Sequence, residues 1–517
     1  MRKLLIIIWA LVVSLTADAQ TVGRDTVGVR LLDSTAVVAD YLDFGRSIYE
    51  MVVSPRQDYL LVMFRDTNKK GTFWKNKGEI GLVSLADKKL LWTQPYNYMW
   101  PAVHLTSSGV MLTNSSGKVT MLGLQTGATL WQQQFSTVQV DDSLGVVLAY
   151  GKGSQHLHAY RLSDGQELWD IKATHNRNWG WNDVVRVDSS RLMVVNDDVM
   201  LFDELTGEFY TYEAKAGVED VKGTLLQGLM AFAGAAAGAA TGIGYIYAPV
   251  GQNMVTKLYA DVIRSDSLYY FADRRSVVCL DSLLRPVWEQ DLPSKTAARS
   301  ILLADDSLLY MLNMGYGWKN GATPMKMGRP FIAAFNRFTG QQLFMNMLTM
   351  KKDIVADAML TPRGIYMMFD DGLAYKPDMR DSTVSITPWD QEEFGRLESM
   401  AHTPVYISYK LKGTYEPFDF DGQNCLVMTE RGDAYVVNER LDIWDQYANE
   451  RLYFPVSKRG DRVWIYHRYP EHEILQVHYL GLPEVRITIA PQVNSFTFTE
   501  ENIFLQTPNR VYMIRGE

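Results

Sequence analysis

The chain has 517 residues, of which 47% are hydrophobic and 12% aromatic, and its net charge is −8. This composition provides enough apolar material for one large core, and the acidic balance disfavours a nucleic-acid ligand, because phosphates require a basic face. The first 19 residues predict a secretory leader. Arg2 and Lys3 precede the apolar run LLIIIWALVVSL, and Ala17-Asp18-Ala19 is a small-x-small cleavage site.

Cleavage before Gln20 leaves residues 20–517 as the mature protein. Because two positive charges and one negative charge are lost, the net charge changes from −8 to −9. The apolar run is too short for a good membrane span, and no Cys follows it to carry a lipid. These features predict an exported bacterial protein, which is periplasmic where the host has two membranes and secreted otherwise.

A short phrase recurs along the chain: a strand, a turn that ends in Gly, and an aromatic residue four positions later. Clear copies occupy 119–131 (VTMLGLQTGATLW) and 157–169 (LHAYRLSDGQELW), and weaker copies occupy 201–211 and 333–344. Two more, at 81–92 and 277–288, keep the Trp but lose the Gly. A unit that repeats every few tens of residues indicates a repeat architecture.

The phrase has the chemistry of a β-hairpin. Gly127, Gly165, Gly207 and Gly340 occupy turn positions that need a positive φ, which Gly adopts without a steric penalty. The aromatic residue is then expected to pack between neighbouring sheets. A second set of short turns, such as DDSLG at 141–145 and DDSLL at 305–309, precedes apolar strands. Together the two sets predict four-stranded propeller blades.

These A-x-D-x-x-T-G-x-x-x-W phrases resemble the repeat of the PQQ-like (pyrroloquinoline-quinone type) β-propeller family. The resemblance is good over 81–344 and fades after residue 356. It implies an all-β fold, a single closed propeller of four-stranded antiparallel blades, with about eight blades. The turns along the sequence number nearer ten. The chain ends in strands that lack a fourth partner, so we expect an N-terminal strand near 27–38 (VGVRLLDSTAVV) to complete the last blade.

Some members of this family are quinoprotein dehydrogenases, which commonly carry adjacent cysteines beneath the quinone. This chain has only Cys279 and Cys425, which we expect to be two buried thiols rather than a disulfide. The non-catalytic branch is the propeller of the outer-membrane β-barrel assembly machinery, which binds partners through its loops. The resemblance therefore favours a scaffold without a cofactor, although the missing lipid-bearing Cys departs from that branch.

The sequence predicts no catalytic residue and no metal site. The eight His residues form no HExxH motif and no CxxC partner set. His156 and His158 point to one face of a strand, but we identify no nearby carboxylate or Cys that completes a site. The run FDFDG at 418–422 lacks the later ligands of a calcium loop, so we interpret it as a hairpin turn.

Residues 223–256 interrupt the repeat and contain no charged side chain. Gly234, Gly238 and Gly242 recur every four residues, so on a helix they would form a smooth stripe of the kind that lets membrane helices approach closely. Two interpretations stay open for this apolar insert: a hairpin or helix packed on the propeller, and a contact with the membrane or with another subunit. The sequence does not predict an oligomeric state.

In a propeller, the connections between blades and the loops between second and third strands emerge on one face. There the chain places Trp100, Trp179, Trp181, Tyr316 and Trp318. Such side chains contact a protein partner, stack on sugars, anchor at a membrane, or fold back to fill the funnel. We therefore hypothesise a non-enzymatic scaffold that binds an envelope protein through this face and the insert. The alternative is a quinone-dependent dehydrogenase or carbohydrate-binding protein that uses the central funnel.

Overall fold

The structure of the protein is a computed structural model. It describes residues 20–70, 73–99, 102–114, 117–151, 156–173, 183–195, 198–213, 262–273, 275–293, 296–319, 323–326, 328–348, 354–361, 363–377, 384–402, 405–408, 415–418, 423–448, 451–468, 473–479, 482–489 and 493–515. These residues form antiparallel β-strands almost throughout, accompanied by the short helix α3 (Gln391–Phe394). Within the described ranges, no helix has the length and apolar character needed to span a bilayer.

We divide the described strands into ten four-stranded antiparallel units, numbered in chain order. Six of them are separate sheets, whereas units 2 and 3 share one seven-stranded sheet and units 9 and 10 lie in one eleven-stranded sheet. Unit 1 contains β3 (Ile48–Val53), β4 (Tyr59–Thr67), β5 (Trp74–Ser84) and β6 (Lys89–Asn97). Unit 2 contains β7 (Ala102–Leu105), β8 (Val110–Thr113), β9 (Lys118–Leu122) and the first part of β10 (Thr129–Asp141). Unit 3 contains the second part of β10, β11 (Val146–Gly151), β12 (His156–Arg161) and β13 (Glu167–Lys172).

The next three units follow the same order. Unit 4 contains β14 (Asp183–Arg186), β15 (Arg191–Val195), β16 (Val199–Asp203) and β17 (Phe209–Tyr212). Unit 5 contains β18 (Ile263–Ser265), β19 (Leu268–Ala272), β20 (Ser276–Leu280) and β21 (Pro286–Asp291). Unit 6 contains β22 (Ser300–Ala304), β23 (Leu308–Asn313), β26 (Phe331–Asn336) and β27 (Gln342–Met347), with the extra hairpin β24 (Tyr316–Lys319) and β25 (Thr323–Lys326).

The last four units complete the order. Unit 7 contains β28 (Val355–Thr361), β29 (Gly364–Phe369), β30 (Gly372–Lys376) and β31 (Thr387–Pro388). Unit 8 contains β32 (Leu397–Met400), β35 (Asn424–Thr429), β36 (Ala434–Asn438) and β37 (Ile443–Tyr447). The hairpin β33 (Tyr406–Ser408) and β34 (Tyr415–Pro417) lies between β32 and β35 in the chain, but it pairs with the first strand of unit 9. Unit 9 contains β38 (Leu452–Arg459), β39 (Arg462–Arg468), β40 (Glu473–Tyr479) and β41 (Leu482–Ile489). Unit 10 contains β42 (Ser495–Phe498), β43 (Asn502–Gln506), β44 (Arg510–Arg515) and β2 (Ala36–Asp43).

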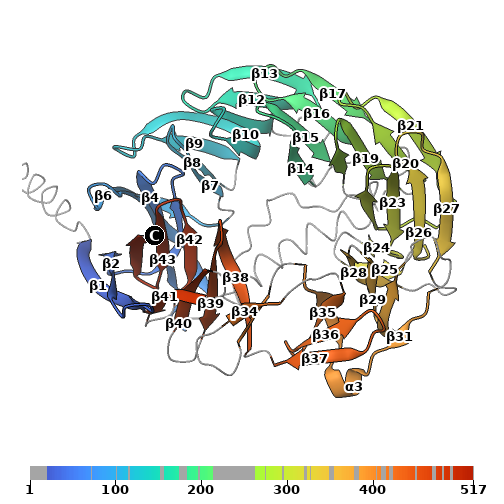
Figure 1. The fold of residues 1–517 in the computed structure, drawn as a ribbon. Helices are drawn as coiled ribbons and strands as arrows, with labels where there is room; N and C mark the ends of the chain where they lie inside the picture. Colours follow the sequence, from blue (N-terminus) through green and yellow to red (C-terminus); the bar gives the residue numbers. More distant parts are fainter. Residues whose placement is uncertain are drawn as a thin grey trace, which may run out of the picture.

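The units stand around a common centre, and in unit 4 the strands run outward from β14 to β17 (Figure 1). The count of about eight blades that the family resemblance implies is too low for this chain. The number of turns in the sequence, nearer ten, agrees with the ten units in the described strands. Cys279 and Cys425 lie in units 5 and 8 as free, buried thiols, so the expectation of two unpaired cysteines is confirmed.

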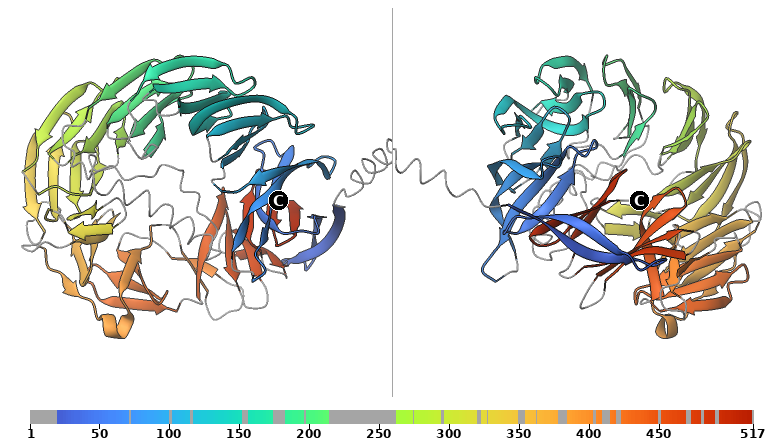
Figure 2. Two further views of the ribbon diagram at one scale, coloured as in Figure 1. Left: turned by 180° about the vertical axis from the view of Figure 1, so that it is seen from behind. Right: turned by 60° about the vertical axis from the view of Figure 1, so that its left-hand side comes forward.

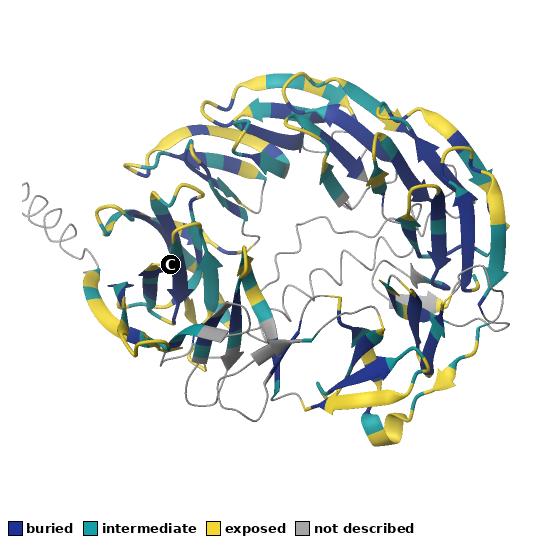
Figure 3. Cartoon of the chain, viewed as in Figure 1, coloured by how far each residue is buried: buried dark blue, intermediate teal, exposed yellow. Residues whose placement is uncertain are grey.

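Neighbouring units share apolar cores, which the burial pattern shows as dark bands along the sheets (Figure 3). Between units 1 and 2, for example, Leu61 and Leu82 pack with Val110 and Leu122. The same arrangement continues from one unit to the next along the chain. Unit 10 also packs against unit 1, because one core contains strand residues of both, namely Leu42, Phe504, Val511, Ile48, Leu60 and Val62. Each sheet therefore buries both of its faces against neighbours.

An N-terminal strand completes the last unit, as the sequence predicts, but this strand is β2, and most of the predicted segment 27–38 belongs to the end of β1 (Thr21–Arg30) and the turn after it. β2 pairs with β44 in an antiparallel register that joins Asp40 to Met513 and Leu42 to Val511. The preceding strand β1 (Thr21–Arg30) pairs with both β2 and β41, so it bridges units 9 and 10. The two further views show these first strands in blue beside the last strands in red (Figure 2). The ends of the described chain thus belong to one sheet.

The repeated Trp joins its unit to the next one at four junctions. Trp131 of unit 2 packs against the Gly turn of unit 3, where a Cβ added to Gly165 would lie 2.8 Å from the indole Cδ2. Its Nε1 donates a hydrogen bond of 2.8 Å to the carbonyl of Leu162 in that turn. Gly165 has a φ of 72°, so it satisfies both the turn and the close approach of the ring. The predicted positive φ of the repeat glycines is confirmed.

The same contact recurs at three other junctions. Trp92, Trp169 and Trp288 donate from Nε1 to a turn carbonyl of the following unit, each at 2.8 Å. Their rings cover Gly127, Gly207 and Gly340, because a Cβ added to any of these glycines would lie within 2.8 Å of the indole. Trp131 and Trp288 are buried, and Trp169 is half-buried. The aromatic residue therefore packs between sheets, as expected, but its Gly partner comes from the next repeat.

A β-bulge precedes each of these Trp residues. In β10 the register shifts between Thr129 and Trp131, so Leu130 is the extra residue. Equivalent shifts occur before Trp92, Trp169 and Trp288. Side chains alternate between the two faces of a strand, so the extra residue of the bulge moves the following Trp to the opposite face. The bulge thereby turns the indole toward the next unit.

The turn residue whose carbonyl accepts the Trp hydrogen bond is Leu in units 2 and 3, but it is a glutamate in unit 4. The carbonyl that accepts from Trp169 belongs to Glu204, whose side chain is fully buried. Its Oε2 lies 2.6 Å from Nη1 of Arg186, which also pairs with Asp141 of unit 3. Burial raises the pKa of Glu204 to about 7, because the attraction of Arg186 only partly offsets the loss of hydration.

Candidate functional site

The predicted loop surface falls largely outside the described residues. This applies to Trp100, Trp179 and Trp181, and also to the insert at 223–256 with its glycines Gly234, Gly238 and Gly242. Trp318 lies in β24, where the structure describes its backbone but not its side chain. Of the predicted contact residues, only Tyr316 has a described side chain, so the hypothesis of one contact surface stays a prediction.

The described aromatic side chains of these loops pack inward. Tyr316 is half-buried against the core shared by units 6 and 7, and its carbonyl accepts a hydrogen bond of 2.8 Å from the backbone of Arg299. Tyr96 and Tyr98, which precede Trp100, are both buried, and their hydroxyls donate to the carbonyls of Thr113 and Glu79. At these three positions the tyrosine side chain packs against an apolar core.

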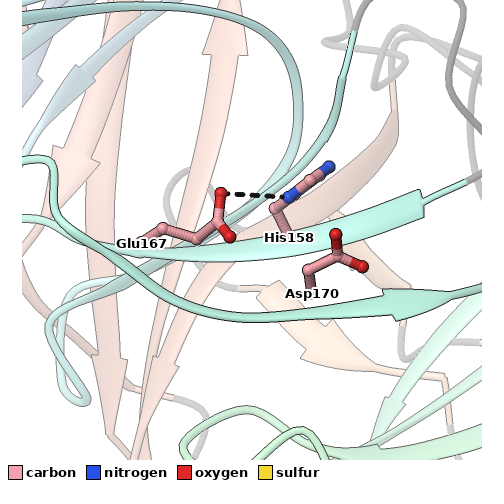
Figure 4. A group of neighbouring side chains, drawn as sticks. All are labelled: His158, Glu167 and Asp170. Atoms are coloured by element: carbon pink, nitrogen blue, oxygen red, sulfur yellow. Dashed lines mark ion pairs between the residues drawn. The ribbon is translucent and has the colours of Figure 1, made fainter.

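A cluster of ionisable side chains lies on the outer two strands of unit 3 (Figure 4). His158 of β12 faces Glu167 and Asp170 of β13, and one ligand atom of each lies within 4.8 Å of the other two. His158 Nδ1 is 3.2 Å from Glu167 Oε2. His156, two residues earlier on β12, places Nδ1 2.6 Å from Asp170 Oδ1. The expectation that no carboxylate lies near these two histidines is therefore wrong.

The strand register explains why sequence reasoning missed the carboxylates. His158 is directly opposite Asp170, and Tyr160 is opposite Glu167, with a register shift at Leu168 between them. In an unbroken strand, Glu167 would share a face with Trp169, because alternate side chains point to opposite faces. The bulge that aims Trp169 at unit 4 moves Glu167 to the histidine face. The bulged repeat phrase together with H-x-H on the preceding strand is the signal that could have identified the group.

Neighbouring rings hold the imidazole of His158 in place. It stacks on Tyr160 with centroids 5.8 Å apart, and Tyr160 in turn stacks on Phe135 of β10 at 4.7 Å. The side chain of His158 is only 15% exposed, whereas those of Glu167 and Asp170 are 49% and 42% exposed. The cluster thus combines one fixed imidazole with two solvent-accessible carboxylates.

The electrostatics of the cluster favour a positive ligand. The hydrogen bond from His156, together with the positive charge that both imidazoles can carry, holds the pKa of Asp170 below its ordinary value. Burial and the adjacent Glu167 raise the pKa of Tyr160 to about 12, so its hydroxyl stays protonated. The carboxyl groups of Glu167 and Asp170 stand within one small space. Chemically, this group can bind a cation, and its N and O donors are those that Zn²⁺ accepts.

A second candidate surface follows the outer edge of the sheets. The extra residue of the bulge is apolar in units 1, 2, 3, 5, 6 and 8, where it is Leu91, Leu130, Leu168, Val287, Leu343 and Trp444. Four of these are exposed, and Trp444 reaches 77%. We call these six side chains the apolar rim. Because a bulge adds one residue to a strand, each of these six units carries one extra side chain at its outermost strand.

One part of this edge is hollowed. A pocket of about 400 Å³ spans units 2, 3 and 4, and its lining includes Leu144, Leu168 and Leu205 together with Arg161 and Ser163. Leu205 precedes the Thr-Gly turn of unit 4 and is 48% exposed. The pocket is therefore lined by Leu168 of the apolar rim and by Leu205 in the turn of the next unit, together with the guanidinium-bearing Arg161.

Comparisons with known proteins give a weak likeness only. No family model matches the chain, and no curated protein matches its sequence. Similar solved structures include BamB from Moraxella catarrhalis, which is 11% identical over 80% of this chain and 96% of that chain, with a TM-score of 0.30. They also include a eukaryotic initiation factor (10% identity, 87% and 97%, TM-score 0.36) and the Pan2 WD40 domain from Neurospora crassa (10% identity, 76% and 89%, TM-score 0.27). These scores are too low to assign the chain to a family.

Proposed function

We propose that this chain is an exported, non-enzymatic β-propeller of the PQQ-like type that acts as a protein-interaction scaffold at the cell envelope. In this proposal the ten units form one closed ring. Its support is the repeat itself: Trp131 and its three equivalents connect a unit to the next at four junctions, and unit 10 packs on unit 1. Export is supported by the leader pattern at residues 1–19.

The observation that carries the scaffold function is the apolar rim. Exposed Leu130, Val287, Leu343 and Trp444 occupy equivalent positions of different units. Single exposed apolar residues are ordinary on protein surfaces, but their recurrence at one position per unit creates a repeated row. Burial of such side chains by a partner gains about 25 cal/mol per Å² of apolar surface removed from water. A long protein partner that follows the rim satisfies this pattern best.

The loop surface is a second part of the proposal. Trp100, Trp179, Trp181, Tyr316 and Trp318, with the insert at 223–256, would contact the membrane or the same complex from the other side of the sheets. Its support is the sequence alone, namely the aromatic loops and the stripe of Gly234, Gly238 and Gly242. Deletion of 223–256 should leave the units folded and release the protein from envelope membranes, and equal co-fractionation of the deleted protein would contradict this part.

A native-gel experiment tests the rim. The tagged chain is expressed in its host, extracted gently from the envelope and separated without denaturation. We expect a complex of higher mass than the chain alone, which is lost in Leu343→Arg and in Leu130→Arg. The matched control is Leu32→Arg, because Leu32 is 97% exposed in the β1–β2 turn, away from the rim. A monomer in every extract, or an equal loss in the Leu32 control, would overturn the proposal.

A further inference from the structure

We propose that His158, Glu167 and Asp170 bind a divalent transition-metal ion, with Zn²⁺ as the ion to test, and that His156 positions Asp170. This site is independent of the scaffold function, since it uses none of the residues of the apolar rim. It lies on the outer strands β12 and β13 of unit 3 and is formed by side chains on one face of that strand pair (Figure 4).

The donor set fits a zinc-type ion. Zn²⁺ binds imidazole nitrogen and carboxylate oxygen at about 2.0–2.2 Å, so tetrahedral ligand atoms lie about 3.4 Å apart. Here the three ligand atoms lie within 4.8 Å of one another. Glu167 and Asp170 are half-exposed and can rotate toward the ion, whereas the stacked ring of His158 stays fixed. Small rotations of the two carboxylates are therefore enough to close the site.

The His158 nitrogen that faces this space is unsatisfied. Its Nδ1 is buried from solvent and makes no hydrogen bond within the described part of the chain, although Glu167 Oε2 lies 3.2 Å away. A buried imidazole nitrogen without a partner costs free energy, and a bound cation removes that cost. The same ion would also neutralise two carboxylates that otherwise repel each other across a short distance.

His156 acts on the ion through Asp170. Its Nδ1 lies 2.6 Å from Asp170 Oδ1, which leaves Oδ2 available to a metal. Ligands that are hydrogen-bonded in this way keep a fixed orientation, and loss of such a partner commonly weakens metal affinity about 10–100-fold. Three protein ligands leave room for water or for a side chain of a bound protein at the remaining positions.

The selectivity of the site follows from its donors. An imidazole with two carboxylates suits Zn²⁺ and its neighbours in the first transition row, whereas Mg²⁺ and Ca²⁺ prefer six or more oxygen ligands. Lys172 lies opposite His156 on the same strand pair, but it makes no ion pair with either carboxylate among the described residues. The ammonium therefore does not already occupy the place of the cation.

Titration calorimetry on the mature chain, with its purification tag removed, tests the proposal with Zn²⁺ alone. We expect one site whose affinity falls about 100-fold or more in His158→Gln and Asp170→Asn, and about tenfold in His156→Gln. With Co²⁺ as a spectroscopic probe, the visible ligand-field bands should disappear in His158→Gln. Mg²⁺ at equal concentration should not compete.

The matched control uses another histidine–aspartate pair. His402 Nε2 lies 2.8 Å from Asp357 Oδ1, but no third metal-binding side chain joins this pair among the described residues. His402→Gln should therefore leave the affinity for Zn²⁺ unchanged. No binding by the wild type, binding that persists in the His158→Gln/Asp170→Asn double variant, or an equal loss in His402→Gln would overturn the site. Urea unfolding without metal shows whether each variant is folded.

Discussion

Replacement of Gly165 by Ala tests whether the contact between Trp and Gly holds neighbouring units together. Gly165 has a φ of 72°, and an added Cβ would lie 2.8 Å from the Trp131 ring. Gly145, in the same unit, has a φ of 67° and nothing within 4 Å of such a Cβ. Both substitutions cost about 1–2 kcal/mol for the left-handed backbone. Only Gly165→Ala must also displace the indole.

That displacement sets the expected difference. Movement of Trp131 breaks the 2.8 Å hydrogen bond from Nε1 to Leu162, and a buried donor left without a partner costs about 1–3 kcal/mol. Gly165→Ala should therefore lower the free energy of unfolding by about 1–3 kcal/mol more than Gly145→Ala. Urea titrations followed by far-UV circular dichroism measure this difference.

A double-mutant cycle separates the contact from backbone strain. In a Trp131→Leu background, where the indole is absent, Gly165→Ala should cost no more than Gly145→Ala. If the two glycine substitutions are equally costly in the wild type, or if the extra cost of Gly165→Ala persists without Trp131, the reasoning fails.

Three other predictions concern buried groups. Trp131→Ala should destabilise the protein by about 3–5 kcal/mol in urea, as large core deletions do, and a change near zero would contradict its place in the core. Because burial raises the pKa of Glu204 to about 7 from the 4.5 of an exposed carboxyl, its favourable contribution is complete below pH 4.5 and is lost as pH rises through 7. The loss should amount to about 3 kcal/mol, and Glu204→Gln should remove that part of the slope between pH 5 and 8; an unchanged slope would exclude Glu204 as its source. Burial raises the pKa of Cys279 to about 11 and of Cys425 to about 12, so a maleimide should label both thiols only after unfolding. Rapid labelling of the native protein would show that they are accessible.

Much of the fold could be predicted because the repeated turns and strands depend on residues that are close together in the sequence. The turn at Gly127 and at Gly165 requires a positive φ, which the structure shows. The last strands of the sequence lack a fourth partner, and this predicts that an N-terminal strand pairs with them, as β2 does with β44. The unbroken strand β10 could not be predicted in this way. It serves as the last strand of unit 2 and the first of unit 3, and nothing in its composition marks that double role.

The candidate sites depend on register, which a single sequence does not reveal. His156 and His158 were recognisable as neighbours on one strand face. Their partners were identified only from the strand pairing, in which Asp170 is opposite His158 and the bulge at Leu168 turns Glu167, opposite Tyr160, to the same face. The six side chains of the apolar rim share this cause, since each is the extra residue of a bulge whose position the pairing partner determines.

The strand that completes the last sheet is among the first to be synthesised, but its pairing partner β44 is synthesised last. β1 and β2 can form a hairpin early, but their partners β41 and β44 lie more than four hundred residues later in the chain, as the hydrogen bond from Arg510 to Asp43 illustrates. Closing so long a loop is slow, and until it closes both edges of the hairpin stay open to mispairing. A chain that ends prematurely never covers these edges. Protease resistance at the amino terminus is therefore expected to depend on the carboxyl-terminal strands.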